Sequence, residues 1–186
     1  MFGPVLRGTG VTLRPPDESD PARFVEWLSD MEVTRMLGHR YRAMAMFQET
    51  EWFKKVGESK DDVVWIIEAD GRAIGSIGIH RIDWHNANGV TGILIGDRTA
   101  WHKGYATEAI RLRTEYAFRQ LNMHKLSSET YAENESIRRA LARSGYREVG
   151  IAREQLFSDG RWYDAWHGEV LGADWRSANL PAERTV

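Results

Sequence analysis

The spacing of apolar residues near the start of the chain predicts one short strand and two helices. Residues 11–14 alternate apolar and polar side chains before two prolines, which is typical of a strand that ends at the prolines. Residues 20–29 and 47–56 carry apolar side chains at helical spacing. Asp17 and Asp20 are candidate N-cap residues for the first of these helices.

The middle of the chain changes to the periodicity of strands. Residues 63–69 and 72–80 flank the pair Asp70 and Gly71, which predicts an antiparallel hairpin with a tight turn. Residues 90–95 form an uninterrupted apolar run of strand length, so we expect that strand to be buried on both faces.

The C-terminal half combines one long helix with further strands. In chain order, the pattern predicts a helix at 104–121, a strand at 125–131, a helix at 134–144 and a hairpin of strands 146–157 and 162–171. Along the whole chain this gives about seven strands and about four helices. We therefore predict a mixed α/β fold of the α+β kind.

Length and composition suit a single globular domain. The chain has 186 residues, of which 42% are hydrophobic and 28% charged, so it is long enough for one sizeable core. We expect one domain over residues 1–175 and a loosely held tail over 176–186. The absence of cysteine, of an export signal and of a membrane-spanning apolar window predicts a cytoplasmic protein without a membrane partner. The net charge of −2 argues against direct nucleic-acid binding.

Residues 93–109 are the segment in which the sequence points to chemistry. An apolar strand leads through a short loop into a small-residue turn at Gly104 and Ala106, which opens the long helix. Free backbone N–H groups and the peptide dipoles at such a helix start favour a phosphate, and small residues let it approach the main chain. Lys103 adds a positive charge. Taken alone, the pattern is also typical of a simple turn before a helix.

The segment WHKGYATEA, which begins at Trp101, resembles the pyrophosphate-binding loop of the GNAT superfamily of N-acetyltransferases. The family pattern Q/R-x-x-G-x-G/A falls on Trp101, Gly104 and Ala106. Tryptophan in place of the first Gln or Arg resembles the branch that contains the ribosomal-protein-alanine and spermidine acetyltransferases. Two later segments extend the resemblance. Residues 134–146 are similar to the family's N…GF segment, and residues 158–164 resemble its closing hairpin, D-G-R-x-x-D.

This resemblance implies a mostly antiparallel central sheet with a V-shaped opening between its two central strands, and acetyl-CoA as the acyl donor. In the family the pantetheine arm lies in the V, where an unpaired strand edge offers it hydrogen bonds. The cofactor-binding residues that the resemblance implies are Ile93, Leu94, Ile95, Trp101, His102, Lys103, Gly104, Tyr105, Ala106, Thr107, Asn134 and Ile137.

The resemblance leaves both proton-transfer groups of the reaction unassigned. Many members carry a glutamate base early in the central strand, where this chain has Val90, and a tyrosine acid where it has Leu141. Ser136 is a candidate for the acid, and Glu129 for a base that acts through water; the alternatives are a helix-capping serine and a solvent-facing glutamate. We expect proton transfer to run largely through water or the substrate amine itself.

The sequence implies no metal and leaves the acceptor open. His80, His124 and His167 lack the spacing of metal ligands. The resemblance implies an amine acceptor, such as a protein N-terminus, a polyamine or another small molecule, and a homodimer. Two alternatives from other classes remain: an acyl-CoA-binding sensor without catalysis, and a partner-binding protein that keeps the fold without the cofactor.

Overall fold

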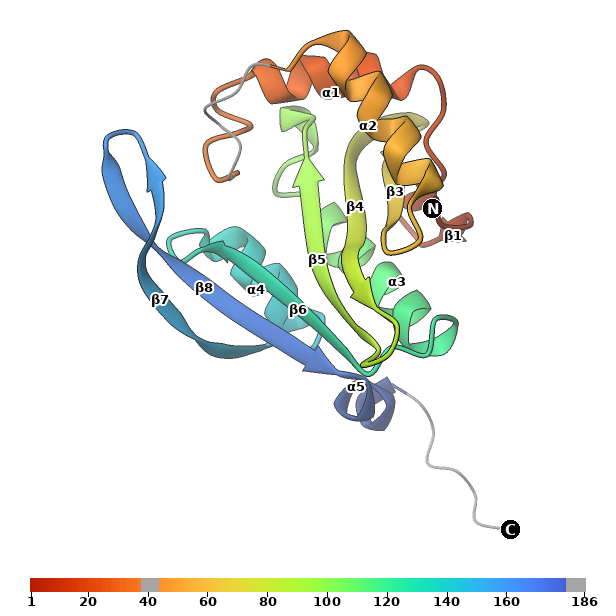
Figure 1. The fold of residues 1–186 in the computed structure, drawn as a ribbon, viewed down its shortest axis with the longest axis vertical. Coiled ribbons are helices and arrows are strands. Elements are labelled where there is room, and N and C mark those ends of the chain that lie inside the picture. Colours follow the sequence, from red (N-terminus) through yellow and green to blue (C-terminus); the bar gives the residue numbers. More distant parts are fainter. Residues whose placement is uncertain (38–43, 180–186) are drawn as a thin grey trace.

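The computed structural model describes residues 1–37 and 44–179 and shows an eight-stranded sheet (Figure 1). The strand order is β1-β2-β3-β4-β5-β6-β8-β7. Every neighbouring pair is antiparallel except β5 and β6, which run parallel. The strands are β1 (Leu6–Arg7), β2 (Thr12–Arg14), β3 (Val63–Ala69), β4 (Arg72–Asp83), β5 (Asn88–Ile95), β6 (Lys125–Tyr131), β7 (Arg147–Ser158) and β8 (Arg161–Leu171).

Helices cover both faces of the sheet (Figure 1). On one face lie α1 (Asp20–Ser29) and α2 (Met46–Glu58), which bury a cluster around Phe24, Phe53 and Ile66. The larger core lies on the other face, under α3 (Tyr105–Arg119) and α4 (Glu135–Arg143). The 3-10 helix η1 (Arg98–Ala100) joins β5 to α3, and α5 (Gly172–Asn179) follows β8.

The predicted fold class is confirmed, with one strand and one helix more than expected in the described residues. Strand β1 has two residues, and α5 extends over residues 176–179 of the predicted tail, whose remainder lies outside the described residues. The prediction that β5 is buried on both faces is wrong. Only Gly89 and Thr91 are buried on it, because β6 diverges from β5 and leaves the end of β5 partly open.

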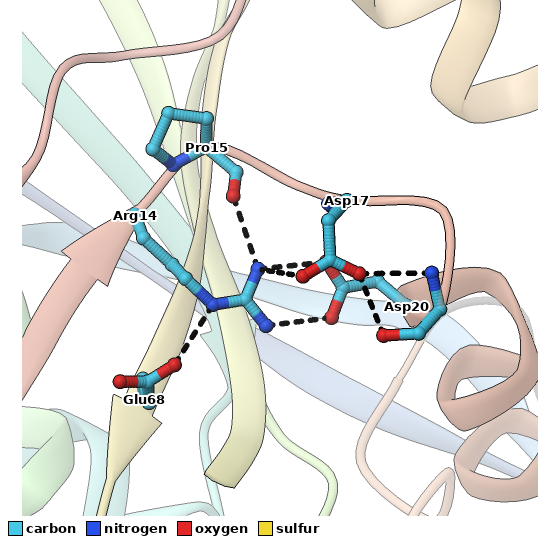
Figure 2. A network of polar contacts seen from close by, with 6 residues as sticks. Arg14, Pro15, Asp17, Asp20 and Glu68 are labelled. Atoms are coloured by element: carbon cyan, nitrogen blue, oxygen red, sulfur yellow. Dashed lines mark hydrogen bonds and ion pairs between the residues drawn. The ribbon is translucent and has the colours of Figure 1, made fainter. Parts of the chain in front are cut away.

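Arg14 joins α1 to the sheet through the polar network of Figure 2. Its guanidinium donates to both carboxylate oxygens of Asp20, at 2.8 and 2.9 Å, and to Glu68 on β3 at 2.9 Å. These acidic partners, with the bidentate Asp20 bond first, raise the pKa of Arg14 above its usual value.

The prediction that Asp17 or Asp20 is the N-cap of the first helix is wrong. Ser19 holds that position, and Asp20 is the first residue of the helix.

Candidate active site

Strands β5 and β6 separate in the middle of the sheet, which forms a V (Figure 1). They pair from Asn88 with Lys125 to Thr91 with Ser128, and among the described residues no β6 partner follows for residues 92–95. The backbone N–H of Gly96 donates to Ile74 on β4. Because backbone groups alternate in direction along a strand, those of Ile93 and Ile95 face away from β4 and into the opening.

The side chains of β5 divide the V into two faces. Ile93 and Ile95 pack against the core under α3, whereas Leu94 packs with the cluster under α1 and α2. By the strand alternation, Val90 and Gly92 share the face of Leu94. The predicted cofactor-binding residues Ile93, Leu94 and Ile95 thus lie at the open edge of β5, and the face of Leu94 is the one that α1 and α2 cover.

The turn before α3 presents a row of free backbone donors. Gly104 is the N-cap of α3 with φ of +87°, and His102 also has a positive φ, of +61°. Within the described part of the chain, the N–H groups of residues 102–106 have no acceptor; the first bonded ones are Thr107 and Glu108, which donate to the Gly104 carbonyl. Successive N–H groups in such a turn, at the positive end of a helix dipole, form an anion-binding concavity.

The loop is fastened to the end of β5 by Trp101. Its indole N–H donates to the carbonyl of Ile95 at 2.9 Å, and the Arg98 guanidinium lies 5.7 Å from the centre of its ring. Lys103 is exposed beside the free N–H groups. An added Cβ at Gly104 would meet no atom within 4 Å, so the space above the turn is open. The predicted loop residues therefore lie together in one turn, whose free N–H groups are next to the V.

Helix α4 begins beside the other arm of the V. Asn134 is its N-cap, and its side-chain oxygen accepts the N–H of Ile137 at 3.3 Å. Ile137 packs partly against the core. Ser136 is exposed in the first turn of α4, and Leu141 is 1% exposed and lies within the core. Asn134 therefore caps the helix, and Ser136 is the one of these side chains that solvent reaches freely.

Glu129 lies on β6 beyond the last residue paired with β5. It accepts a hydrogen bond from Gln155 at 2.9 Å and lies 3.6 Å from Nε2 of His167. A groove runs along this part of the sheet, lined by Arg81, Val90, Lys125, Ser127, Ser128, Glu129, Val149, His167, Gly168 and Glu169. The other carboxylate of the groove, Glu169, forms an ion pair with Lys125 at 3.3 Å. Among the described residues, Glu129 has no ion pair with a Lys or Arg.

A buried arginine that the sequence pattern did not reveal lies where the strands separate. Arg113 on α3 is 1% exposed; it donates to the Tyr146 hydroxyl at 2.9 Å and to the Gly92 carbonyl at 3.4 Å. Its Nε has no partner among the described residues. Burial lowers the pKa of Arg113, with the Tyr146 hydroxyl opposing the shift. The sequence did contain a signal for this burial. Arg113 stands on the same face of its helix as Ala109, Ile110 and Ala117, which are core residues.

The family model described as "Acetyltransferase (GNAT) domain" matches residues 11–147. The chain belongs to the GNAT acetyltransferase family. Among curated GNAT relatives, it is 27% identical over 171 residues to the uncharacterized N-acetyltransferase YoaA of Bacillus subtilis, which covers 88% of this chain and 94% of that protein. It is 24% identical over 155 residues to the spermidine N(1)-acetyltransferase of Escherichia coli K12, which covers 83% and 82%.

Solved GNAT structures share the fold. The spermidine N-acetyltransferase of Vibrio cholerae, crystallised with CoA and spermine, superposes with a TM-score of 0.83 at 20% identity, over 90% of this chain and 99% of that one. The protein is thus an acetyltransferase by family, and nothing in these comparisons favours the sensor alternative.

The described residues show neither a metal-binding cluster nor a membrane-spanning helix. Residues 1–37 and 44–179 contain no group of three His, Asp or Glu side chains placed to hold a metal ion. No helix in the same part of the chain has the length and apolar character needed to span a membrane.

Proposed function

We propose that this GNAT protein transfers the acetyl group of acetyl-CoA to a primary amine by direct attack in a ternary complex. The observation that carries the proposal is the row of free N–H groups at residues 102–106, directly beside the unpaired edge of β5. An acyl-CoA needs both features, since its pyrophosphate is an anion and its pantetheine arm is a chain of amides.

In this proposal the residues implied by the sequence act in three groups. The pyrophosphate binds to the turn at Gly104, with Lys103 as an added charge. The pantetheine arm extends along Ile93 and Ile95, with the start of α4 on its other side. The free N–H near Ile95 stabilises the oxyanion that forms when the amine attacks the thioester.

Proton transfer is the demanding part of the reaction. An alkyl amine with a pKa of about 10.4 is protonated at pH 7, and its neutral form costs about 4.6 kcal/mol. Glu129 in the groove is a candidate to receive the proton through water, and exposed Ser136 a candidate to protonate the departing thiolate. Relatives named as spermidine acetyltransferases support an amine acceptor, with the polyamines, protein N-termini and small amines as the classes to compare.

The test is release of free thiol from acetyl-CoA in the presence of an acceptor panel. We expect turnover with at least one of spermidine, spermine, a set of peptides with free N-termini, and small primary amines. Calorimetric titration with acetyl-CoA runs in parallel. Binding without turnover on any acceptor would favour the sensor, and a folded protein that binds neither acetyl-CoA nor CoA would refute the proposal.

A further inference from the structure

His80 and Asp62 form an oriented pair on the face of the sheet that carries Val90. Nδ1 of His80 lies 3.1 Å from Oδ1 of Asp62, and Oδ2 accepts the Ser59 hydroxyl at 2.7 Å. The backbone N–H of Arg81 donates to Oδ1 at 3.3 Å. Burial opposes ionisation of Asp62, but these hydrogen bonds outweigh it and hold the pKa of Asp62 below its usual value. The carboxylate is therefore charged and fixed beside the ring at neutral pH.

Two glycines give the imidazole its place on the strands. Gly78 and Gly92 are cross-strand partners on β4 and β5. A Cβ on Gly78 would lie 2.6 Å from Nε2 of His80, and one on Gly92 would lie 3.7 Å from the same atom. Real Cβ atoms do not approach a ring atom to 2.6 Å, so the ring position depends on glycine at 78.

These contacts place Nε2 at the base of the V. Gly92 is the first residue of β5 without a β6 partner, and the next peptide N–H, that of Ile93, faces into the opening. Nε2 has no hydrogen-bond partner among the described residues, and 35% of the side chain is exposed. His80 is also the cross-strand partner of Val90, which lines the neighbouring groove.

We propose that His80, oriented by Asp62, is the general base for the acceptor amine. The proposal rests on the proposed function and deepens it. With Nδ1–H donating to Asp62, Nε2 has the lone pair needed to accept a proton. Asp62 is a positioning residue, because it sets the tautomer and ring orientation and acts through His80.

The acceptor ammonium gives one proton to Nε2, and its nitrogen lone pair forms the C–N bond at the thioester carbon while the C=O π electrons move to the oxygen. The tetrahedral species then expels the thiolate with the C–S electrons. The second nitrogen proton ends on that sulfur, and the imidazolium returns the first proton to solvent.

The charged groups near the His80 ring are the other groups that can contribute to the pH dependence of the rate. Within the described residues, the only carboxylate in ion-pair range of His80 is Asp62, from the loop before β3. Strands β4 and β5 contribute Gly78 and Gly92 under the ring, and the adjoining groove carries Arg81, Lys125 and Glu129. A limb of the rate profile that belongs to His80 must therefore survive Glu129→Gln and disappear with His80→Gln.

The experiment measures kcat and KM against pH 5–9 for wild type, His80→Gln and Asp62→Asn, on whichever acceptor turns over. We expect His80→Gln to lower kcat/KM by about 100-fold or more and to remove the acidic limb, and Asp62→Asn to lower it about tenfold or more. Added imidazole should restore part of the rate of His80→Ala. His85→Gln is the matched control, since His85 is exposed in the turn after β4, and it should behave as wild type.

Folding and cofactor binding are checked separately by circular dichroism and by calorimetry with acetyl-CoA. If His80→Gln folds, binds acetyl-CoA and keeps wild-type kcat/KM with an unchanged profile, His80 is not the base, although the acetyltransferase proposal stands. If wild type turns over no amine, the proposed function fails first. NMR of the His80 ring then gives an independent answer, because a protonated Nε2 with a bare Nδ1 at neutral pH would overturn the orientation that the proposal needs.

Discussion

Gly104→Val tests the proposed anion site at the turn before α3. The residue is the N-cap of α3, and its φ of +87° lies in the left-handed region. The substitution therefore has two separate consequences: a backbone strain, which is a cost in stability, and an added side chain in the space above the free N–H groups, which is a cost in affinity. The structure allows the two to be separated.

The stability cost is that of a β-branched residue in a left-handed conformation. A non-glycine residue there costs about 1–2 kcal/mol, and no protein atom lies within 4 Å of the added Cβ to increase it. For a chain of 186 residues, each kcal/mol lowers the melting temperature by about 2–4 °C. We expect Gly104→Val to melt about 2–8 °C below wild type and to remain folded.

The affinity cost is larger. Phosphate oxygens approach N–H donors to about 3 Å, and the valine methyl groups would occupy that space. A hydrogen bond to a charged group contributes about 1.5–3 kcal/mol, so loss of two raises the Kd for acetyl-CoA by at least about 100-fold. We expect no measurable binding by calorimetry at concentrations that saturate wild type.

Gly160→Val is the matched control. Gly160 has φ of +74° in the turn between β7 and β8, and a Cβ there also meets nothing within 4 Å. It should lose similar stability and keep its affinity for acetyl-CoA. If both variants bind acetyl-CoA equally well, the turn at Gly104 does not hold the pyrophosphate. If circular dichroism shows that Gly104→Val alone fails to fold, the turn at Gly104 has a structural role of its own.

Three further outcomes follow from the structure. Tyr146→Phe should lower the free energy of unfolding in urea by about 1–3 kcal/mol, because it leaves buried Arg113 without its closest hydrogen-bond partner. Adding Arg113→Met to this variant should restore most of the loss, and additive losses would refute an energetic coupling between Arg113 and Tyr146. Ser136→Ala should lower kcat less than about tenfold, whereas a hundredfold loss with unchanged binding would make Ser136 the acid. The Ser19 hydroxyl and N–H lower the pKa of Asp17, so the stability that the Asp17 carboxylate contributes is present above its unfolded pKa of about 3.9 and is lost as the pH falls through its folded pKa. Asp17→Asn should therefore flatten the decline in the free energy of unfolding in urea between pH 5 and 2, and an unchanged slope would contradict this.

The sequence predicted elements well where one periodic face is buried. Helix α1 was predicted with its observed bounds, because its apolar residues recur at helical spacing and Phe24 and Trp27 are buried. Strand β6 was also predicted with its observed bounds, although Leu126 and Tyr131 are its only buried residues. Strand β1 was missed since two residues carry no periodicity; it exists through its pairing with β2. The exposure of β5 was also missed, because an apolar run does not reveal that its parallel neighbour leaves after four residues.

The candidate site was predictable where residue type alone limits the backbone. Glycine at 104 signals a left-handed turn before a helix, and the structure has it. The positive φ of His102 carries no such signal, although it helps to aim the same N–H groups. Arg113 likewise required the tertiary structure, because a helical arginine usually reaches solvent and here meets Tyr146 under the sheet.

His80 shows why a correctly predicted hairpin was still insufficient. The tight turn pairs Ala69 with Arg72, and the same register continued to the strand ends would set Asp61 opposite His80. A bulge between Ile67 and Glu68 shifts the pairing by one residue, so that Val63 meets Ile79 and Asp62 comes next to His80. Because a shift of one residue exchanges the faces of a strand, the bulge decides which aspartate reaches the imidazole. A bulge leaves no periodic signature in the sequence, and the proposed base therefore emerges only from the observed register.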